Sequence, residues 1–320
     1  MKAIRVHSFG DAEVMQLEEI PGLAPSEKQI KIEVKAVGIN PVDTYIRAGI
    51  YPIKPDLPYT PGSDAAGIIS AVGNSVKHFK VGQRVYILRS ITGTYAKEVL
   101  CEAGQVFPLP DNIDFSAGAA LGVPYSTAFF ALNYRAQARP GETVLIHGAS
   151  GAVGLAAVQI ARANGLRVIG TAGTEKGIEL LKQQGVIAAL NHNEENYLDA
   201  IDGLTCGTGV DVILEMLANI NLDADLKKLA RFGRVVVIGN RGTIEIDPRD
   251  TMGKNGSILG MSLFNATQQE LDQIHAVIRA GLEDGRYKPI IHCEMPLVDA
   301  VKSHELVMET GVNGKIVLIP

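Results

Sequence analysis

The sequence predicts an α/β protein in which an antiparallel, barrel-like domain is joined to a doubly wound domain built on a parallel sheet. Three observations predict this fold class. A strand, a glycine turn and a helix follow one another over residues 143–162, β-branched runs alternate with amphipathic stretches after them, and short strands lie among Gly and Pro turns before residue 120. With 320 residues and 46% hydrophobic content, the chain is long enough for two cores.

The segment with the glycine turn is the most informative. Residues 143–147 form an apolar run, Gly148, Gly151 and Gly154 follow it, and residues 155–162 have a helical pattern. Glycines allow a tight turn and a close backbone approach, while the helix N-terminus offers unpaired amides to a pyrophosphate. Three glycines alone would be weak evidence, because such turns often only connect a strand to a helix. In this context they indicate a dinucleotide site.

Further apolar, β-branched runs support a parallel sheet. They lie at residues 166–170, 209–214, 234–239 and 257–260. Amphipathic stretches separate most of them, including 176–184, which ends at Gly185, and 222–232, which ends at Gly233. A glycine at such a position can adopt the left-handed conformation that ends a helix. Apolar strands that alternate with helices are typical of a doubly wound sheet.

The two ends of the chain have a different pattern of apolar residues and turns. Residues 29–37 alternate in face, and 67–72 and 81–88 are short strands between turns, as in an antiparallel barrel. After a predicted helix at 268–280, strand-like runs at 288–292 and 314–319 carry no glycine fingerprint, so we expect this tail to rejoin the first domain. The predicted boundaries are 1–124 and 265–320 for the barrel domain and 125–264 for the dinucleotide domain. With no long linker between them, we expect a ligand cleft where the domains meet.

The composition of the chain indicates which kinds of partner to expect. A net charge of −5 and a pI near 5.8 give no basic block, which favours a small-molecule substrate over nucleic acid. The N-terminus lacks an apolar signal core, and no apolar run approaches the ~18 residues that a membrane helix needs, so we expect a cytoplasmic protein without a membrane partner. Cys101, Cys206 and Cys293 are odd in number and dispersed, as expected of reduced thiols.

Seven sequence blocks carry a resemblance to a known family. They are residues 40–47, 58–64, 122–127, 147–154, 170–174, 215–219 and 241–251. On these blocks the chain resembles, end to end, the zinc-free, zeta-crystallin-like quinone reductases of the medium-chain dehydrogenase/reductase superfamily. The resemblance implies a GroES-like catalytic domain, a Rossmann domain that binds NADPH, and reduction of ortho-quinones by one-electron transfers.

The resemblance also indicates a reaction without zinc. In zinc-dependent members of the superfamily, thiolate, imidazole or carboxylate ligands stand where this chain has Asn40, Ser63 and Val123. A valine offers no lone pair, and three dispersed cysteines cannot build the family's structural zinc lobe, so we expect no metal. Alcohol oxidation needs a Lewis acid or a placed base. A quinone or conjugated enone is already electrophilic, and hydrogen bonds can stabilise its reduced oxygen.

The turn after the second predicted parallel strand indicates NADPH rather than NADH. NAD-specific sites place an acidic residue about 20 positions after the glycines, and here 172–174 are Ala, Gly and Thr. A neutral turn leaves room for a 2′-phosphate, for which Lys176, His192 and Arg241 are candidates, Arg241 being preferred. Against this, Glu175 could turn inward and repel a phosphate, and Lys176 could be only an exposed charge at the start of a helix.

Cofactor contacts follow from the resemblance at matching positions. The backbone near residue 150 would hold the pyrophosphate, and residues near 240 would border the nicotinamide or the adenosine. Thr127 adds a hydroxyl that could contact the cofactor or only cap a helix. The implied contacts are Tyr45, Ser150, Gly151, Ala152, Val153, Gly173, His192, Asn221, Ile238, Gly239, Asn240, Arg241, Met261, Ser262 and Leu263.

Catalytic candidates gather in the Pro-rich region 40–59. A flat acceptor could stack on tyrosine rings and accept hydrogen bonds from phenol or amide groups, which favours Asn40 and Tyr45 as the leading pair. Tyr51 and Tyr59 are further candidates that could equally be half-buried packing residues. Asp43 could orient Tyr45 or Arg47 rather than catalyse, and we interpret His147 as structural.

The sequence is compatible with two other functions, and it predicts an oligomer. An NADPH-dependent enone or alkenal reductase would share this fold and cofactor. A non-catalytic role, as an AU-rich RNA-binding or lens structural protein, is also known among zeta-crystallin-like proteins. An exposed edge strand near 257–263 could pair across a two-fold axis, so we expect a homodimer or a homotetramer.

Overall fold

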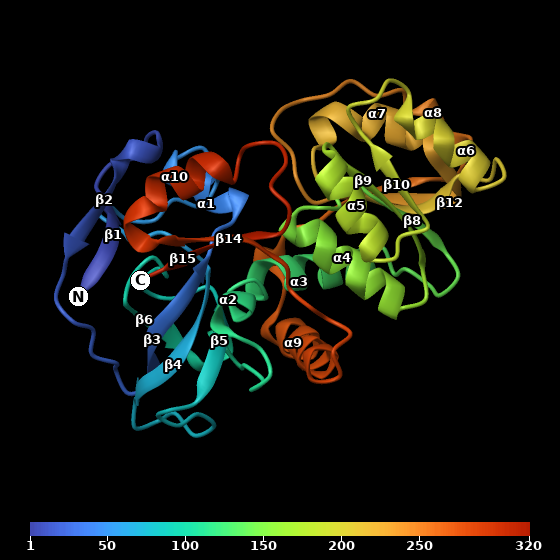
Figure 1. Cartoon of the computed structure of the whole chain (residues 1–320). Helices are drawn as coiled ribbons and strands as arrows, with labels where there is room; N and C mark the ends of the chain where they lie inside the picture. The colour runs from blue at the N-terminus through green and yellow to red at the C-terminus, as the bar shows by residue number, and fades with distance from the viewer. The chain divides into compact units, whose positions relative to one another are not determined.

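The computed structural model describes all 320 residues and divides into two compact units (Figure 1). Unit 1 comprises Met1–Val123 and His275–Pro320, and unit 2 comprises Pro124–Ile274. Two helices, α3 (Gly122–Phe129) and α9 (Gln268–Glu283), extend across the two unit boundaries. No helix of the chain has both the length and the apolar character that spanning a bilayer requires.

Unit 1 contains a seven-stranded sheet and a separate two-stranded sheet. The large sheet has the order β14-β15-β3-β4-β5-β7, with β6 also paired to β3, and only the β14–β15 pair is parallel. The strands are β1 (Lys2–Val6), β2 (Met15–Glu19), β3 (Gln29–Gly38), β4 (Asp64–Val72), β5 (Arg84–Leu88), β6 (Glu98–Glu102), β7 (Val106–Pro108), β14 (Ile291–Pro296) and β15 (Lys315–Ile319). The short helices are η1 (Ala12–Val14), α1 (Pro41–Arg47), η2 (Ala103–Gln105), α2 (Phe115–Gly118), η6 (Leu297–Asp299) and α10 (Ala300–Leu306).

The long strand β3 organises unit 1. Its alternating residues Ile30, Ile32 and Val34 are buried in one hydrophobic core, as a strand with one face toward a core requires. Pairing of β15 with β3, with Val317 opposite Gly38, places the C-terminal strand in this sheet. The strand expected at 81–88 begins only at residue 84, because the preceding residues form a turn.

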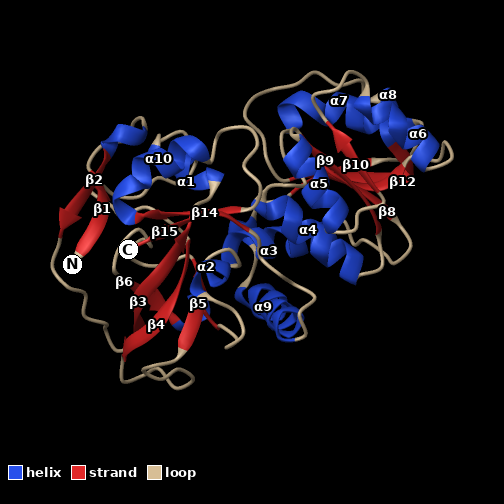
Figure 2. Cartoon of the chain, viewed as in Figure 1, coloured by secondary structure: helices blue, strands red, loops and turns tan.

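Unit 2 is built on a six-stranded parallel sheet with the order β10-β9-β8-β11-β12-β13. Figure 2 shows strands of this sheet in red with helices beside them in blue. Its strands are β8 (Thr143–Ile146), β9 (Arg167–Ala172), β10 (Ala188–Asn191), β11 (Val210–Glu215), β12 (Leu229–Val237) and β13 (Ser257–Gly260). The helices are α4 (Ala152–Ala163), α5 (Glu175–Gln183), η4 (Tyr197–Asp199), α6 (Ala200–Leu204), α7 (Ala218–Lys228), α8 (Arg249–Met252) and η5 (Leu263–Asn265), preceded by the π-helix η3 (Phe130–Arg135).

The order of the strands reverses at one point of this sheet. The chain winds from β8 to β9 and β10, then crosses back to β11 beside β8, so the direction of winding reverses between β8 and β11. Helices α4 and α5 contact β8, β9 and β10, whereas α7 packs on β11 and β12 through a core that includes Leu222 and Leu226. In open α/β sheets, ligands bind at the carboxyl ends of the strands at such a reversal. The prediction of a doubly wound parallel sheet is confirmed.

One helix prediction is partly wrong. We expected a helix over 222–232 that ends at Gly233, but α7 covers Ala218–Lys228 and β12 begins at Leu229. Leu229 pairs with Val210 of β11 and is buried, so tertiary pairing overrides the helical pattern. The left-handed residue is Phe232, with φ of 64°, whereas Gly185 has the predicted left-handed φ of 75°.

Candidate functional site

The glycine turn connects β8 to α4 in unit 2. Gly148 has φ of 54°, and Gly151 is the residue that precedes α4. A Cβ at Gly154 would lie 2.5 Å from Cα of Ala149, so only glycine permits this close approach. The turn is attached to β9, because the amides of Gly148 and Ala149 donate to Thr171 at 3.1 and 2.8 Å. Residues 150–153 therefore lie at a helix N-terminus suited to a phosphate.

The turn after β9 brings two predicted cofactor residues together. A Cβ at Gly173 would lie 2.6 Å from Nε2 of His192, which follows β10. Burial lowers the pKa of His192, and the neighbouring His147 lowers it further. Thr174 caps α5 by accepting a 3.1 Å hydrogen bond from the amide of Gly177. The turn itself contains no acidic side chain.

The charged candidates differ in their distance from that turn. Lys176 and Glu175 are both exposed on the first turn of α5, directly after it. Arg241 is exposed beyond the end of β12, and its amide donates to Oδ1 of Asn219 at 2.9 Å. Strands β8 and β11 lie between β9 and β12, which separates those strands by about 14 Å. The strand order therefore favours Lys176 over Arg241 for a phosphate beside Gly173.

The other predicted cofactor residues lie after β11, β12 and β13. Asn221 on α7 donates to Oε1 of Glu215 at 3.2 Å. The amides of Ile238 and Gly239 donate to the Glu215 carbonyl at 2.9 and 3.2 Å, which joins the two loops. Asn240 donates to the Gly242 carbonyl at 2.7 Å, Met261 and Ser262 are half-buried after β13, Leu263 is buried in η5, and Thr127 is buried on α3.

Asn40 belongs to a buried polar network in unit 1. Its Nδ2 donates to Oδ2 of Asp64 at 2.9 Å, and its Oδ1 accepts from Nζ of Lys315 at 2.6 Å. The Lys315 ammonium also lies 2.8 Å from Oδ2 of Asp64, and the amide of Val123 donates to Oδ1 of Asp64 at 2.8 Å. The Asn40 side chain is thus committed to internal partners and is only 2% exposed.

The residues in and beside this network show whether a zinc ion would fit there. The three positions expected to replace the zinc ligands hold an amide, a hydroxyl and a valine side chain, and none is a ligand type that zinc prefers. The buried Lys315 ammonium is bonded to Asn40 within this network and would repel a divalent cation. The residues at these positions do not fit zinc.

Two of the predicted tyrosines meet at the end of α1. Tyr45 is half-buried on α1, and its carbonyl accepts a 3.3 Å hydrogen bond from the amide of Tyr51. Burial raises the pKa of Tyr51, whereas the nearby charge of Arg89 lowers it. Arg89 follows β5 in the left-handed region, with φ of 66°, and its amide donates to Ser63 at 2.7 Å. Sequence reasoning missed Arg89, and its position directly after a strand was the available signal.

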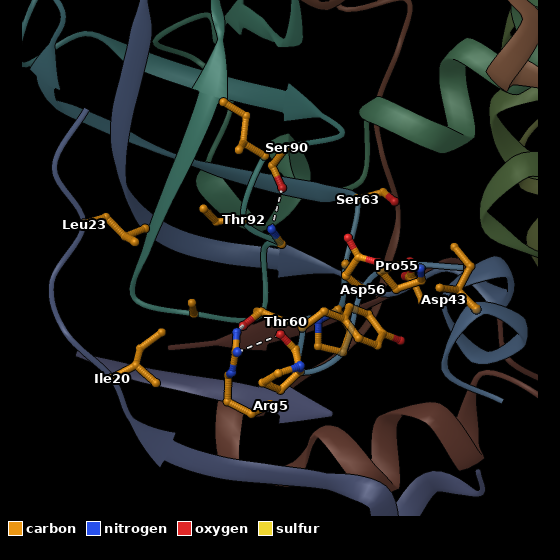
Figure 3. Close-up of a pocket in the computed structure, with 18 of the residues that line it drawn as sticks. Arg5, Ile20, Leu23, Asp43, Pro55, Asp56, Thr60, Ser63, Ser90 and Thr92 are labelled. Atoms are coloured by element: carbon orange, nitrogen blue, oxygen red, sulfur yellow. Dashed lines mark hydrogen bonds between the residues drawn. The ribbon is translucent and has the colours of Figure 1, made fainter. Parts of the chain in front are cut away.

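Tyr59 lines a cavity of about 520 Å³ that lies within unit 1. Figure 3 shows this cavity, with Arg5, Asp43 and Thr60 labelled. Arg5, Asp43 and Thr60 also line it, and Arg5 donates to the Thr60 hydroxyl at 3.3 Å. The Tyr59 hydroxyl is buried without a hydrogen-bond partner, and burial raises its pKa. Burial also raises the pKa of Asp43 to about 7, although the Asn40 amide bonds to this carboxyl. The other three catalytic candidates are not among the lining residues.

Comparison with known proteins agrees with this fold. A family model described as an alcohol dehydrogenase GroES-like domain matches residues 26–111, and one described as a zinc-binding dehydrogenase matches 152–279. These two domains define a medium-chain dehydrogenase/reductase, a class of oxidoreductases. The quinone oxidoreductase of Rattus norvegicus is 52% identical over 321 residues, which cover 100% of this chain and 98% of the relative. The chain belongs to the quinone oxidoreductase family.

Solved structures agree with the fold. The Escherichia coli quinone oxidoreductase complexed with NADPH matches with a TM-score of 0.91 and 32% identity over 100% of both chains. The CurK enoyl reductase matches with a TM-score of 0.90 and 28% identity, covering 99% of this chain and 98% of that one.

Proposed function

We propose that this chain is an NADPH-dependent quinone reductase that works without a metal ion. The observation that carries the proposal is the 52% identity with a quinone oxidoreductase over the whole chain. The Asn40, Asp64 and Lys315 network supports the metal-free part, because the Lys315 ammonium already pairs with the Asp64 carboxylate and would repel a divalent cation. Acceptors that are already electrophilic, such as ortho-quinones, suit such a site.

Unit 2 would hold the cofactor. The amides at the N-terminus of α4 would bind the pyrophosphate, and the neutral turn at Gly173 would admit the 2′-phosphate beside Lys176 and His192. The solved relative from Escherichia coli, whose complex contains NADPH, supports this choice of cofactor. When bound, NADPH supplies the reducing equivalents from C4 of its nicotinamide ring.

Unit 1 would bind the acceptor. The ring of Tyr45 offers a stacking surface, and the hydroxyl of Tyr51 offers a hydrogen bond to a quinone oxygen. Arg89, whose charge already affects Tyr51, would stabilise the negative charge that develops on that oxygen during reduction. We assign Asn40 a positioning role at the start of α1, because its amide already bonds to Asp64 and Lys315.

We further propose that the protein is a cytoplasmic homodimer or homotetramer. Its three cysteines are all free, as is usual in a reducing compartment. Strand β13 is the edge of the sheet in unit 2 and offers unpaired backbone groups to a second copy.

The direct test is oxidation of NADPH and of NADH by the purified protein. The acceptors are 9,10-phenanthrenequinone and a simple enone, each with and without a strong chelator. We expect turnover with the quinone that prefers NADPH and that survives chelation. Loss of turnover on chelation would contradict the metal-free mechanism, and turnover with the enone alone would contradict the quinone assignment.

An enone reductase is the second candidate. The observation that favours it is the similarity to the CurK enoyl reductase over nearly the whole chain. Its lower identity of 28%, against 52% for the rat quinone oxidoreductase, places it second.

A further inference from the structure

Three ionisable side chains without a role in the proposed reaction meet inside unit 2. His147 follows β8, Glu215 ends β11, and Asp225 lies on α7, and all three are buried. Nε2 of His147 lies 2.7 Å from Oδ1 of Asp225 and 3.5 Å from Oε2 of Glu215. Burying charges costs free energy unless they are paired or neutralised by a proton.

The geometry of this cluster favours a proton on the carboxyl pair. Oε2 of Glu215 and Oδ2 of Asp225 are buried and accept no hydrogen bond from another residue. One side-chain ligand atom of each of the three residues lies within 4.8 Å of the other two, so the carboxyl groups are close neighbours. Two ionised carboxylates in contact repel each other, whereas one proton between them satisfies both. Burial raises the pKa of each carboxyl to about 7, and it lowers the pKa of His147.

Glu215 connects this pair to the loops that would hold the cofactor. Its Oε1 accepts hydrogen bonds from the amide of Leu217 and from Nδ2 of Asn221. Its carbonyl accepts from the amides of Ile238 and Gly239. Asn221, Ile238 and Gly239 are all proposed cofactor contacts, so a shift of Glu215 would move both loops.

We propose that Glu215 and Asp225 form a proton-sharing pair that positions these loops, so that NADPH binds more tightly when the pair holds its proton than when it has lost it. The proposal rests on the NADPH binding proposed above and adds a proton linkage to it. Loss of the proton would place two like charges within 4.8 Å of each other and push Glu215 away from Asn221. It would also add negative charge beneath a polyanionic cofactor.

The neighbouring groups do not offer the same linkage. His147 and His192 have lowered pKa values because of burial, so they are neutral throughout the range above pH 7. Burial and the nearby carboxylates raise the pKa of Tyr197, which keeps it protonated there. The carboxyl pair is therefore the group that changes charge near pH 7. Because binding favours its protonated form, affinity should fall as the pH rises, and binding should take up protons.

The experiment measures NADPH binding directly, without quinone. Fluorescence titrations between pH 6.5 and 8.5 compare the wild type with Glu215→Gln, Asp225→Asn and the control Asp223→Asn. Asp223 lies on the same helix, but its side chain is 38% exposed and pairs with Lys227. Between pH 6.5 and 8.5, we expect the Kd for NADPH to rise in the wild type and in the control. The factor by which it rises should be about five times the factor seen for Glu215→Gln. Titration of the cofactor's own phosphate cancels in this comparison.

Calorimetry in two buffers of different ionisation enthalpy gives the second readout. The wild type should take up a fraction of a proton on binding NADPH at pH 8, and Glu215→Gln should take up none. Equal pH dependence in the wild type and Glu215→Gln, or no proton uptake by the wild type, would overturn the proposal. So would a stoichiometric metal ion in the wild type that Asp225→Asn loses. If the glutamine variant does not fold, the calorimetry of the wild type decides.

The outcomes separate this inference from the proposed function. Binding of NADPH with proton uptake but without quinone turnover would leave the inference standing and overturn the proposed activity. Absence of NADPH binding at every pH would overturn both.

Discussion

Arg89 is the residue whose chemistry best matches the acceptor half of the proposed reaction. It is cationic, half-buried and close enough to Tyr51 to affect that phenol's pKa. Its left-handed backbone, with φ of 66°, is unusual for a residue with a long side chain. Unusual backbone conformations are concentrated at functional sites, which supports a role for Arg89 beyond packing.

Replacing this cation should slow the reduction of quinones. We expect Arg89→Gln to lower kcat by roughly tenfold, since one charged hydrogen-bond donor commonly contributes this much or more to a developing anion. Steady-state assays should show an unchanged KM for NADPH, and Arg89→Lys should recover part of the lost rate. A kcat within twofold of the wild type in Arg89→Gln would remove Arg89 from the mechanism.

Lys176 should determine the preference for NADPH over NADH. It is exposed on the first turn of α5, beside the turn at Gly173. Without its charge, a 2′-phosphate loses an ion pair, so Lys176→Ala should raise the KM for NADPH by roughly fivefold and leave the KM for NADH unchanged. Lys182→Ala, an exposed lysine in the last turn of the same helix, is the matched control. Equal effects on both cofactors would contradict this role.

At the residue scale, positions with local requirements could be predicted and long-range networks could not. Gly154 and Gly173 are readable in the sequence, because the glycine turn and the neutral turn after β9 are short local patterns. Asn40 was also identified, but its side chain is committed to Lys315, which lies 275 positions away. No local pattern reveals such a partner, nor the meeting of His147, Glu215 and Asp225.

At the element scale, two helices are each attached to unit 1 through a neutral histidine. Nδ1 of His275 on α9 lies 2.8 Å from the Tyr86 hydroxyl, and Nε2 of His304 on α10 lies 2.9 Å from the Tyr95 hydroxyl. Both imidazoles are buried, and burial lowers the pKa of each to about 3. The unfolded chain binds protons at these histidines near pH 6.5, whereas the folded chain does not.

These histidines should make unit 1 sensitive to acid. Because the unfolded state binds more protons between pH 6.5 and 3, the free energy of unfolding falls as the pH falls through this window. Two such groups contribute a slope of about 2.7 kcal/mol per pH unit well below pH 6.5. Urea denaturation between pH 6 and 4.5 should therefore show a shallower slope for the double variant His275→Gln/His304→Gln. An identical slope would show that neither histidine is buried neutral.

Helices and strands could be predicted from the sequence where their own local pattern determines where they begin and end. Strand β13 coincides with the predicted run at 257–260, and α5 ends before Gly185 as its pattern indicates. The join between α7 and β12 failed because residues that continue the helical pattern are drawn into the sheet by β11. Strand β10 was missed, because its four half-buried residues carry little hydrophobic signal.

At the scale of the whole molecule, the open edge of the sheet in unit 2 remains to be accounted for. Strand β13 pairs only with β12, and Ile258 on it is 39% exposed. An exposed edge strand is a template for pairing with another chain unless it is covered. A second copy related by a two-fold axis would cover it with the same strand and close the assembly.

Removing one outward amide should therefore change the oligomeric state. The Met261 amide donates to the Val237 carbonyl of β12 at 3.1 Å, and alternation along a strand then directs the Ile258 amide away from β12. Ile258→Pro deletes this donor without breaking a bond to β12, and proline is tolerated on edge strands. Light scattering should show the wild type as a dimer or tetramer and the variant as a smaller species.

The control is Ile220→Ala, at another exposed isoleucine of unit 2. Alanine is used there because proline would break α7. This control should leave the mass unchanged. An Ile258→Pro protein with the wild-type mass would place the interface elsewhere.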